Sequence, residues 1–267
     1  MNELSYIYFT DFHGYESKYE RLLSETVGIG VKLLVSGGDI CPHGNPGHFL
    51  HKFLPNWLKR AQKAGIKVYG MFGNDDLAAN LPILDDLQVK GLFIRIDGET
   101  VEYEGWNFWG YNFVPELPFG LKDWVKYDYA GAPRPPQSSH PVLSVDNGFI
   151  LIPDIELFLH DRNTIEEDLE SVKLDDPGHT IAVMHSPPYG VGLDVCSGGR
   201  TVGSRSILKF IRREQPILSL HGHIHESPQI SGKWKVNIGR TVAVQPGPAP
   251  VLITMTENKI QAQYLRV

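Results

Sequence analysis

Hydrophobic and polar positions follow two different periods along the first third of the chain. Short runs of β-branched and aromatic residues are typical of buried strands, and each run is followed by a segment with an apolar residue every three or four positions, which is typical of a helix. The predicted strands are 4–10, 32–35 and 67–72. The predicted helices are 17–27, 47–64 and 77–87, the last bent or restarted by Pro82. This order of elements favours βαβ units and a largely parallel sheet.

The pattern changes after this first third. We expect antiparallel strands at 92–96, 100–103 and 106–111, and a long loop at about 112–147, which is rich in proline, glycine and aromatic residues. A loop of that length inside a compact domain is usually functional or mobile, so we expect it near the active site. The later elements are predicted to be helices at 164–172 and 204–213, strands at 180–184 and 216–220, and three or four antiparallel strands over 233–267. No internal repeat or linker divides the chain, so we expect a single domain over residues 1–267.

Composition sets the class of protein. Of the 267 residues, 42% are hydrophobic and 21% are charged, which excludes disorder, collagen and coiled coil. The net charge of −6 provides no global positive field for nucleic acid, so a nucleic-acid partner is not expected. Two cysteines are too few for a disulfide framework, no apolar stretch is long enough to span a bilayer, and no leader sequence is recognised. We therefore expect a cytoplasmic protein without a membrane segment, whose oligomeric state these features do not define.

Polar side chains follow directly on five of the predicted strands. They are Asp11, His13, Asp39, Asn74, Asp75, His185, His223 and His225. Because the carboxyl ends of strands in open α/β sheets form the crevice in which ligands bind, we expect these side chains to share one edge. Imidazole nitrogens mixed with carboxylate and amide oxygens suit Mn²⁺, Fe, Zn²⁺, Co²⁺ or Ni²⁺ and are too rich in nitrogen for Ca²⁺. The set exceeds what one tetrahedral ion needs, which predicts two divalent transition-metal ions.

Five short motifs contain these residues in a fixed order. They read Asp11-Phe12-His13, Gly38-Asp39, Gly73-Asn74-Asp75-Asp76, His185 and Gly222-His223-Ile224-His225. The chain resembles the calcineurin-like metallophosphoesterases, whose ordered signature is D-x-H, G-D, G-N-H-[DE], H and G-H-x-H, and it looks especially like the small prokaryotic members. The resemblance implies an α/β fold, a four-layer α/β/β/α sandwich with a dinuclear metal site at one end of the two sheets.

The resemblance also implies roles for the site residues. One metal would take Asp11, His13 and His225, the other would take Asn74, His185 and His223, and Asp39 would bridge the two. The implied activity is hydrolysis of a phosphodiester or phosphomonoester by attack of a metal-bridging hydroxide, with a phosphodiesterase favoured. The implied substrate is a small phosphorylated molecule or a nucleotide. The alternatives are a nuclease of the same fold and a non-catalytic metal-binding or scaffold protein.

One position departs from the family signature. Asp75 stands where the family has a histidine that contacts the phosphate and protonates the leaving oxygen. An aspartate has an ordinary pKa of about 3.9, so it is mostly ionised at pH 7 and repels a phosphate. We therefore expect Asn74 and Asp75 to be the catalytic residues of a hydrolase with little general-acid help, which favours good leaving groups. His221 is expected to pack or form hydrogen bonds rather than bind metal. Asp76 is expected to cap the following helix or support the Asn74 turn rather than bind metal.

Substrate contacts are predicted at Arg200, Arg205 and His43. The arginines could grip a phosphate, and the aromatic residues of 112–147 could form a lid that stacks on a base. The alternative is that the arginines are solvated and the aromatic residues pack the loop onto the sheets.

Overall fold

Strand β1 lies in the middle of a six-stranded sheet in the computed structural model, which describes residues 3–44 and 46–265. The apolar and aromatic run of β1 is almost wholly buried, as expected of a strand covered on both faces. The strands of this first sheet, in spatial order, are β16 (Lys259–Tyr264), β15 (Val251–Thr256), β1 (Leu4–Phe9), β2 (Leu33–Ser36), β3 (Lys67–Gly70) and β4 (Ile94–Arg95). β1 to β4 are parallel, and β15 and β16 are antiparallel to their neighbours.

The second sheet also has six strands, with four parallel strands between two antiparallel ones. In spatial order they are β13 (Lys235–Ile238), β14 (Thr241–Val244), β12 (Leu218–Leu220), β11 (Thr180–Met184), β6 (Trp106–Tyr111) and β5 (Thr100–Tyr103). The antiparallel pairing expected over 92–111 is found between β5 and β6. It is wrong for β4, because helix α3 connects β3 to β4 and a crossover of this kind makes the two strands parallel.

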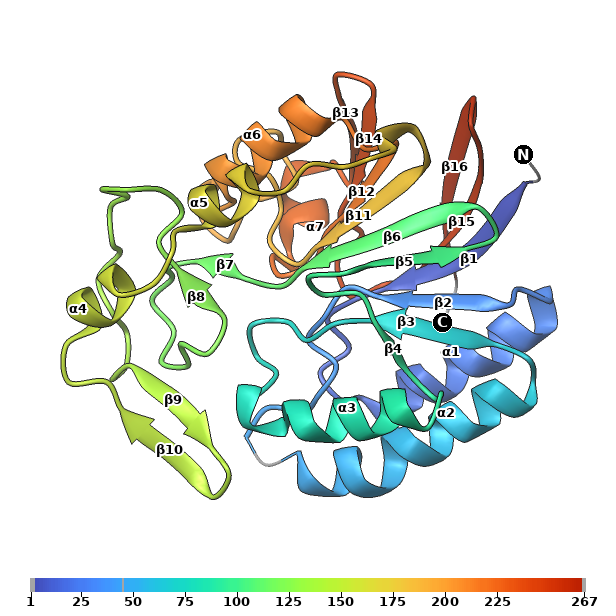
Figure 1. Ribbon diagram of the computed structural model, residues 1–267, viewed down its shortest axis with the longest axis horizontal. Helices are drawn as coiled ribbons and strands as arrows, with labels where there is room; N and C mark the ends of the chain where they lie inside the picture. The colour runs from blue at the N-terminus through green and yellow to red at the C-terminus, as the bar shows by residue number, and fades with distance from the viewer. Residues whose placement is uncertain (1–2, 45, 266–267) are drawn as a thin grey trace.

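Helices cover the outer faces of both sheets (Figure 1). Those over the first sheet are α1 (Glu16–Ile29), α2 (Leu54–Lys63) and α3 (Leu81–Val89), and those over the second are α5 (Ile165–Glu170) and α6 (Arg205–Glu214). The predicted helix at 47–64 begins as a π-helix, η1 (Phe49–Phe53), and the restart at Pro82 is found, because the 3₁₀ turn η2 (Ala78–Asn80) precedes α3. Shorter elements are the 3₁₀ turn η3 (Pro177–His179) and helix α7 (Ser227–Ser231).

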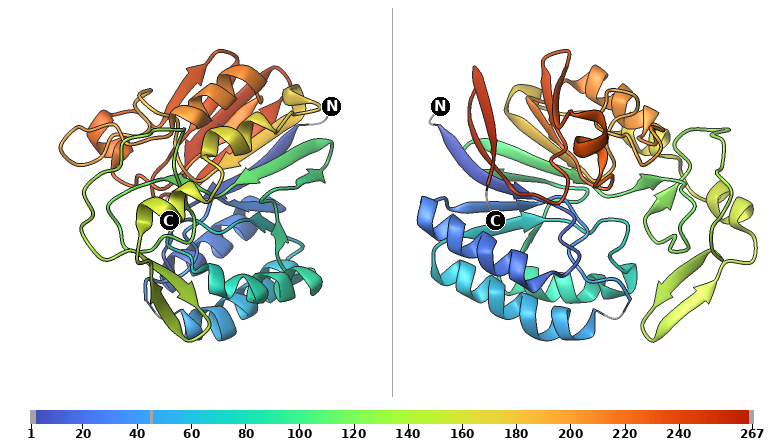
Figure 2. Two further views of the ribbon diagram at one scale, coloured as in Figure 1. Left: turned by 60° about the vertical axis from the view of Figure 1, so that its left-hand side comes forward. Right: turned by 180° about the vertical axis from the view of Figure 1, so that it is seen from behind.

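Three apolar clusters separate the layers. Between the sheets, Tyr6 and Tyr69 of the first sheet pack edge-on against Phe108 of the second. The outer face of the first sheet packs against α1 and α2, and that of the second packs against α5 and α6. The predicted four-layer α/β/β/α sandwich is thereby confirmed, and Figure 2 shows its layers from two further sides. Within the described part of the chain, no helix is long and apolar enough to cross a membrane.

Residues 112–160, hereafter the lobe, extend from one end of the sandwich (Figure 1). The long loop expected at 112–147 contains short regular elements instead. The lobe comprises β7 (Val114–Pro115), β8 (Val125–Lys126), the hairpin of β9 (Val142–Val145) with β10 (Gly148–Leu151), and α4 (Ile155–His160). Strands of two to four residues are too short to give a periodic signal in the sequence. A hydrogen bond connects the lobe to the sandwich, because the indole N–H of Trp124 donates to the Asp76 carbonyl at 2.6 Å.

Candidate metal centre

The turns that follow five strands meet at one end of the two sheets. Asp11 and His13 follow β1, Asp39 follows β2, Asn74 and Asp75 follow β3, His185 follows β11, and His223 and His225 follow β12. The first sheet therefore supplies the carboxylates, the amide and one imidazole, and the second sheet supplies three imidazoles. All eight predicted residues belong to this cluster, hereafter the metal centre.

One half of the metal centre contains two carboxylates and two imidazoles. Donor atoms of Asp11, His13, Asp39 and His225 all lie within 4.8 Å of one another. His13 Nε2 is 3.0 Å from His225 Nε2, and His225 Nε2 is 3.3 Å from Asp11 Oδ1. Two imidazole nitrogens and two carboxylates at these separations can hold a divalent cation.

The other half is centred on His185, whose side chain is fully buried. Its Nε2 is 3.0 Å from Asn74 Oδ1 and 3.3 Å from Asp39 Oδ2, and the His223 ring lies 5.3 Å away between centroids. Asp39 Oδ2 is also 3.9 Å from His13 Nε2. Asp39 therefore faces both halves of the metal centre.

A hydrogen bond from outside the metal centre orients His185. His185 Nδ1 is 2.8 Å from the Gly37 carbonyl oxygen. Because a carbonyl only accepts, Nδ1 carries a proton, and Nε2 is the ring nitrogen that faces the cluster. Asp11 Oδ2, His13 Nδ1 and His223 Nε2 are buried and have no hydrogen-bond partner within the described residues. Buried polar atoms are normally paired, so these atoms fit a site whose remaining partner is a cation.

The backbone of the metal centre is strained. Six non-glycine residues of the described chain have a positive φ, and four of them are in the metal centre: Asp11 at 58°, His13 at 44°, Asp39 at 51° and His223 at 67°. Such conformations cost of the order of 1–3 kcal/mol each and persist where the surrounding structure imposes them. Backbone conformations of this kind cluster at active sites and ligand sites, and four of the six lie in this one cluster.

Two glycines allow the turns to approach one another. A Cβ atom on Gly73 would lie 2.3 Å from Asp39 Oδ1, and a Cβ atom on Gly222 would lie 2.2 Å from Thr10 Oγ1 and 2.7 Å from Asp11 Oδ2. Both positions therefore require glycine if the carboxylates are to keep their places.

The charges of the metal centre shift pKa values in opposite directions. Burial opposes ionisation of Asp39, but the neighbouring His185 and His13 outweigh it and lower the pKa of Asp39. Burial opposes protonation of His185, yet Asp39 and Asp11 raise its pKa to about 9. Burial and the charge of His185 lower the pKa of His223 to about 3. Because metal ligands must be deprotonated, a bound cation would replace the proton of His185.

Asp75 lies at the rim of the metal centre beside His43. Its backbone N–H donates to Asp39 Oδ1 at 2.9 Å, and its Oδ1 accepts from Asn74 Nδ2 at 2.9 Å. Asp75 Oδ2 is 3.5 Å from His43 Nδ1, and the His43 ring is stacked on His13 at 4.5 Å between centroids. Burial and the nearby Asp39 raise the pKa of Asp75 to about 6. His43, which was predicted as a substrate contact, thus lies beside the metal centre.

Asp76 supports the turns, as predicted. Its buried carboxylate accepts from the backbone N–H groups of Gly73, Ile40 and Cys41 at 2.8, 3.0 and 2.7 Å. It thereby ties the turn after β3 to the turn after β2, which carries Asp39.

His221 forms hydrogen bonds behind the ligands, also as predicted. Its Nδ1 lies 2.9 Å from the Met184 carbonyl and 3.0 Å from the Ser186 carbonyl, so this nitrogen carries the proton. Its Nε2 then accepts from Ser219 Oγ at 2.9 Å. Both ring nitrogens are occupied, and His221 has no lone pair left for a metal ion.

A cavity of about 650 Å³ opens beside the metal centre. It is lined by Asp39, His43, Asn74, Asp75, residues 117–121, Cys196, Ser197, Arg200, Val202 and residues 223–226. Arg200 therefore lies where the sequence predicted a substrate contact. The described lining does not include Arg205, whose guanidinium lies over the Tyr189 ring, 4.2 Å from its centroid. Sequence reasoning expected the loop at about 112–147 near the active site, but it did not single out the apolar residues at 117–121, which include Phe119.

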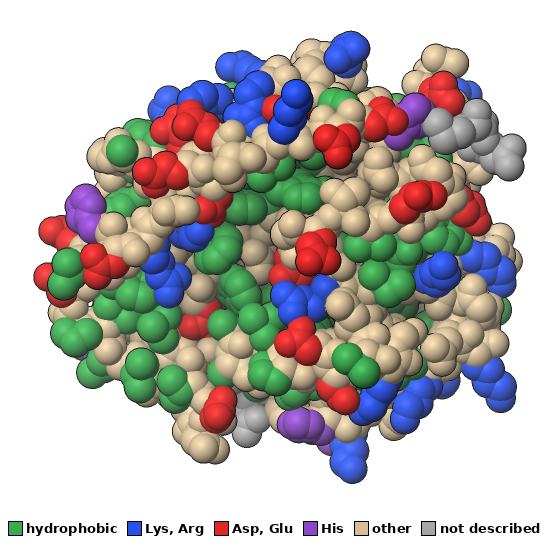
Figure 3. Space-filling model, in the orientation of Figure 1, with side chains coloured by type: hydrophobic (Ala, Val, Ile, Leu, Met, Phe, Trp, Pro, Cys, Tyr) green, Lys and Arg blue, Asp and Glu red, His purple; other side chains and the backbone are tan. Residues whose placement is uncertain are grey.

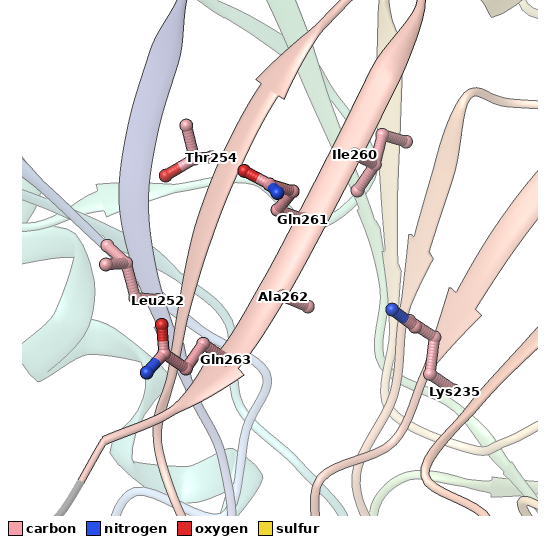
Figure 4. A pocket seen from close by; sticks show the side chains of 7 residues that line it. All are labelled: Lys235, Leu252, Thr254, Ile260, Gln261, Ala262 and Gln263. Carbon is pink, nitrogen blue, oxygen red and sulfur yellow. The ribbon is translucent and has the colours of Figure 1, made fainter.

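Another hollow, of about 430 Å³, lies against β15 and β16 (Figure 4). Its described lining is Lys235, Leu252, Thr254, Ile260, Gln261, Ala262 and Gln263. Because this lining contains neither histidine nor carboxylate, the hollow offers no set of metal ligands.

Comparison with known proteins agrees with this geometry. The model of the calcineurin-like phosphoesterase family matches residues 4–227. The chain belongs to this family. Membership places it among the metal-dependent phosphoesterases, which implies divalent metal ions and a phosphorylated substrate. Comparison with curated proteins gave no significant match.

Two solved structures share this fold. One has 14% sequence identity and a TM-score of 0.63, with 99% of this chain and 100% of that chain covered. A protein of Thermus thermophilus has 13% identity and a TM-score of 0.56, with the same coverage. An archaeal phosphodiesterase is less similar, with 10% identity and a TM-score of 0.47, covering 98% of this chain and 100% of that chain.

Proposed function

We propose that the protein hydrolyses small phosphodiesters with two divalent transition-metal ions bound at the metal centre. The observation that supports this most strongly is the place of Asp39. Its Oδ2 is 3.3 Å from His185 Nε2 and 3.9 Å from His13 Nε2, so one carboxylate faces both groups of imidazoles. A carboxylate in this position suits a bridging ligand between two ions.

The proposed ligand sets divide the metal centre in two. One ion is held by Asp11, His13 and His225, the other by Asn74, His185 and His223, and Asp39 is shared. The donor set suits Mn²⁺, Fe, Zn²⁺, Co²⁺ or Ni²⁺. Two such ions would supply positive charge for the phosphoryl transition state and would lower the pKa of water enough for hydroxide to serve as the nucleophile at neutral pH.

Asp75 favours particular substrates within this proposal. Its carboxylate lines the cavity beside Asn74, where it repels a dianionic phosphomonoester more strongly than a monoanionic diester. No histidine occupies this position in the chain, so a leaving oxygen departs with little proton transfer. Esters of good leaving groups, such as aryl diesters, are therefore the favoured substrates.

Metal analysis and a hydrolysis panel test the proposal. The purified protein should hold about two transition-metal ions per chain. Asp39→Asn should lose most of this metal and the activity, whereas Asp175→Asn, which alters an exposed carboxylate, should keep both. With Mn²⁺, bis(p-nitrophenyl) phosphate should be hydrolysed faster than p-nitrophenyl phosphate, cyclic nucleotides or single-stranded DNA. Faster hydrolysis of the monoester would contradict the assignment of a diesterase.

The two alternatives give different results in the same panel. A nuclease would hydrolyse single-stranded DNA at least as fast as the aryl diester. Acidic and basic side chains are interspersed on the face in Figure 3, without a continuous basic stripe, which does not favour this outcome. A scaffold protein would be purified without metal and would hydrolyse none of the substrates.

A further inference from the structure

One side of the cavity beside the metal centre is apolar. Residues 117–121, hereafter the apolar wall, run along it as Leu-Pro-Phe-Gly-Leu in the loop between β7 and β8. Phe119 is 52% exposed although it is a large aromatic side chain. An exposed aromatic ring beside a catalytic centre offers a flat surface on which another ring can stack.

The apolar wall is held in place at both ends. Glu116 and Lys122 flank it and form a buried ion pair, with Lys122 Nζ 3.2 Å from Glu116 Oε1. Lys122 Nζ also donates to the Leu117 carbonyl at 2.7 Å, and Gln137 Nε2 donates to Glu116 Oε1 at 2.8 Å.

The segment behind the apolar wall supports it as well. The backbone N–H of Ser138 donates to the Pro118 carbonyl at 3.0 Å, and that of Val142 donates to the Gly120 carbonyl at 2.8 Å. The wall is therefore organised before any ligand binds, which reduces the entropy lost on binding.

The described lining of the cavity carries few positively charged side chains. Arg200 is the one lysine or arginine among the described residues that line it, and no hydrogen bond or ion pair engages its guanidinium in the described chain. The carboxylates of Asp39, Asp75 and Glu226 line the same cavity. One guanidinium can pair with one phosphate, whereas a second anionic group would meet carboxylates without a matching cation.

We propose that the substrate is a phosphate diester with one flat, uncharged aromatic group, and that this group stacks on Phe119 while Arg200 pairs with the phosphate. This inference rests on the proposed function and names its substrate class. The aromatic group is either a plain aryl ring or a nucleobase, since both present a flat π surface. Phe119 acts as a specificity-determining residue, because it contacts the group that does not react.

Binding of phosphinates to the metal-loaded protein tests the proposal without turnover, because they carry one negative charge, as a diester does, and neither of their carbon–phosphorus bonds is hydrolysed. Calorimetry should show that methyl(phenyl)phosphinate binds about tenfold more tightly than dimethylphosphinate. Phe119→Ala should reduce this ratio to about twofold, and Phe119→Leu should give an intermediate ratio. Phe149→Ala is the matched control, because Phe149 is also 52% exposed but lies on β10 and does not line this cavity. It should keep the tenfold ratio.

Two further binding measurements distinguish a nucleobase from a plain aryl ring and test whether Arg200 binds the phosphate. A methylphosphinate that carries adenine on an acyclic linker should bind at least as tightly as methyl(phenyl)phosphinate if the natural group is a nucleobase, and more weakly if it is a plain aryl ring. Arg200→Gln should weaken binding of all phosphinates by about the same factor, without changing the ratio of phenyl to methyl.

Specific outcomes would overturn the inference. Equal binding of methyl(phenyl)phosphinate and dimethylphosphinate, a ratio unchanged by Phe119→Ala, or no binding of either compound would each do so. If the protein hydrolyses diesters but shows equal binding, the proposed function stands and the aromatic subsite fails. If it hydrolyses none but the ratio depends on Phe119, the subsite stands and the proposed function fails.

Discussion

His221 shows how the neighbours of a histidine decide whether it can bind metal. It lies two residues from His223, but carbonyl groups and a serine hydroxyl occupy both of its ring nitrogens. Burial lowers the pKa of His221 to about 4, so the ring is neutral in the folded protein. An unfolded chain binds a proton at this residue near the ordinary pKa of about 6.5.

The depressed pKa of His221 predicts a pH dependence of stability. Between about pH 6.5 and 4 the unfolded chain binds a proton at His221 that the folded chain does not. Proton binding therefore favours the unfolded chain in this window, so the free energy of unfolding is highest above about pH 6.5 and decreases as the pH falls. His221→Gln should remove up to about 1.4 kcal/mol per pH unit from the slope in this window. The measurement is the free energy of unfolding by urea at several pH values, with a chelator present. If the free energy of unfolding depends on pH in the same way for the wild type and for His221→Gln, His221 does not contribute to the pH dependence of stability.

Residues with a motif were predictable, and residues without one were not. The eight residues of the metal centre follow strands and occur in five ordered motifs, so the sequence predicted that they meet at one end of the sheets, while their roles stay a prediction. The sequence also placed the loop that contains Phe119 near the active site, but the loop has no periodicity, and the fold is needed to single out Phe119 as part of the cavity lining. Arg205 was predicted from its residue type alone, and the structure places it over Tyr189 instead of in the cavity lining.

At the scale of elements, the segment 116–122 depends on one buried ion pair. The side chains of Lys122 and Glu116 are 0% and 2% exposed. Burial lowers the pKa of Lys122 and raises that of Glu116, and their mutual attraction opposes both shifts. Removing one partner leaves the other charge buried without compensation.

Lys122→Met should therefore destabilise the protein by about 3 kcal/mol, whereas the double variant with Glu116→Gln should recover part of the loss. The midpoint of urea unfolding measures both effects. Lys90→Met is the control, since Lys90 forms an exposed pair with Asp86 and its loss should cost less than about 1 kcal/mol. A single variant as stable as the control would show that the pair is dispensable.

Elements with a strong local pattern were also predictable. The strands at 100–103, 106–111 and 180–184 have the predicted bounds, and α5, which Thr164 opens with a capping box, lies within the helix predicted at 164–172. The direction of β4 depends on the crossover from β3, and the strands of the lobe are only two to four residues long. Tertiary pairing decides these features, and no local pattern encodes them.

At the scale of the whole molecule, the metal centre joins the two sheets. Asp11, Asp39 and Asn74 come from the first sheet, and His185 and His223 come from the second. Bound ions would therefore connect the two halves of the sandwich as well as serve catalysis, and their binding energy adds to the stability of the folded state.

Removal of metal should lower the melting temperature. At a free metal concentration 100 times the Kd, binding stabilises the folded state by about 2.7 kcal/mol, which corresponds to roughly 5–10 °C for a chain of this size. Calorimetry with Mn²⁺ and with excess chelator measures the difference. Asp39→Asn should show a much smaller difference, and an equal one would mean that the stabilising ions bind elsewhere.

The distance along the chain between the two sets of ligands matters during synthesis. His185 follows Asn74 by 111 residues. At about 5–20 residues per second, a ribosome needs roughly 6 to 20 s to add this interval. During that time the nascent chain exposes Asp11, His13, Asp39 and Asn74 without the imidazoles that complete the site. With the proposed ligand sets, metal capture would therefore be a late event, which follows translation of most of the chain and selects among the ions present when the second sheet has formed.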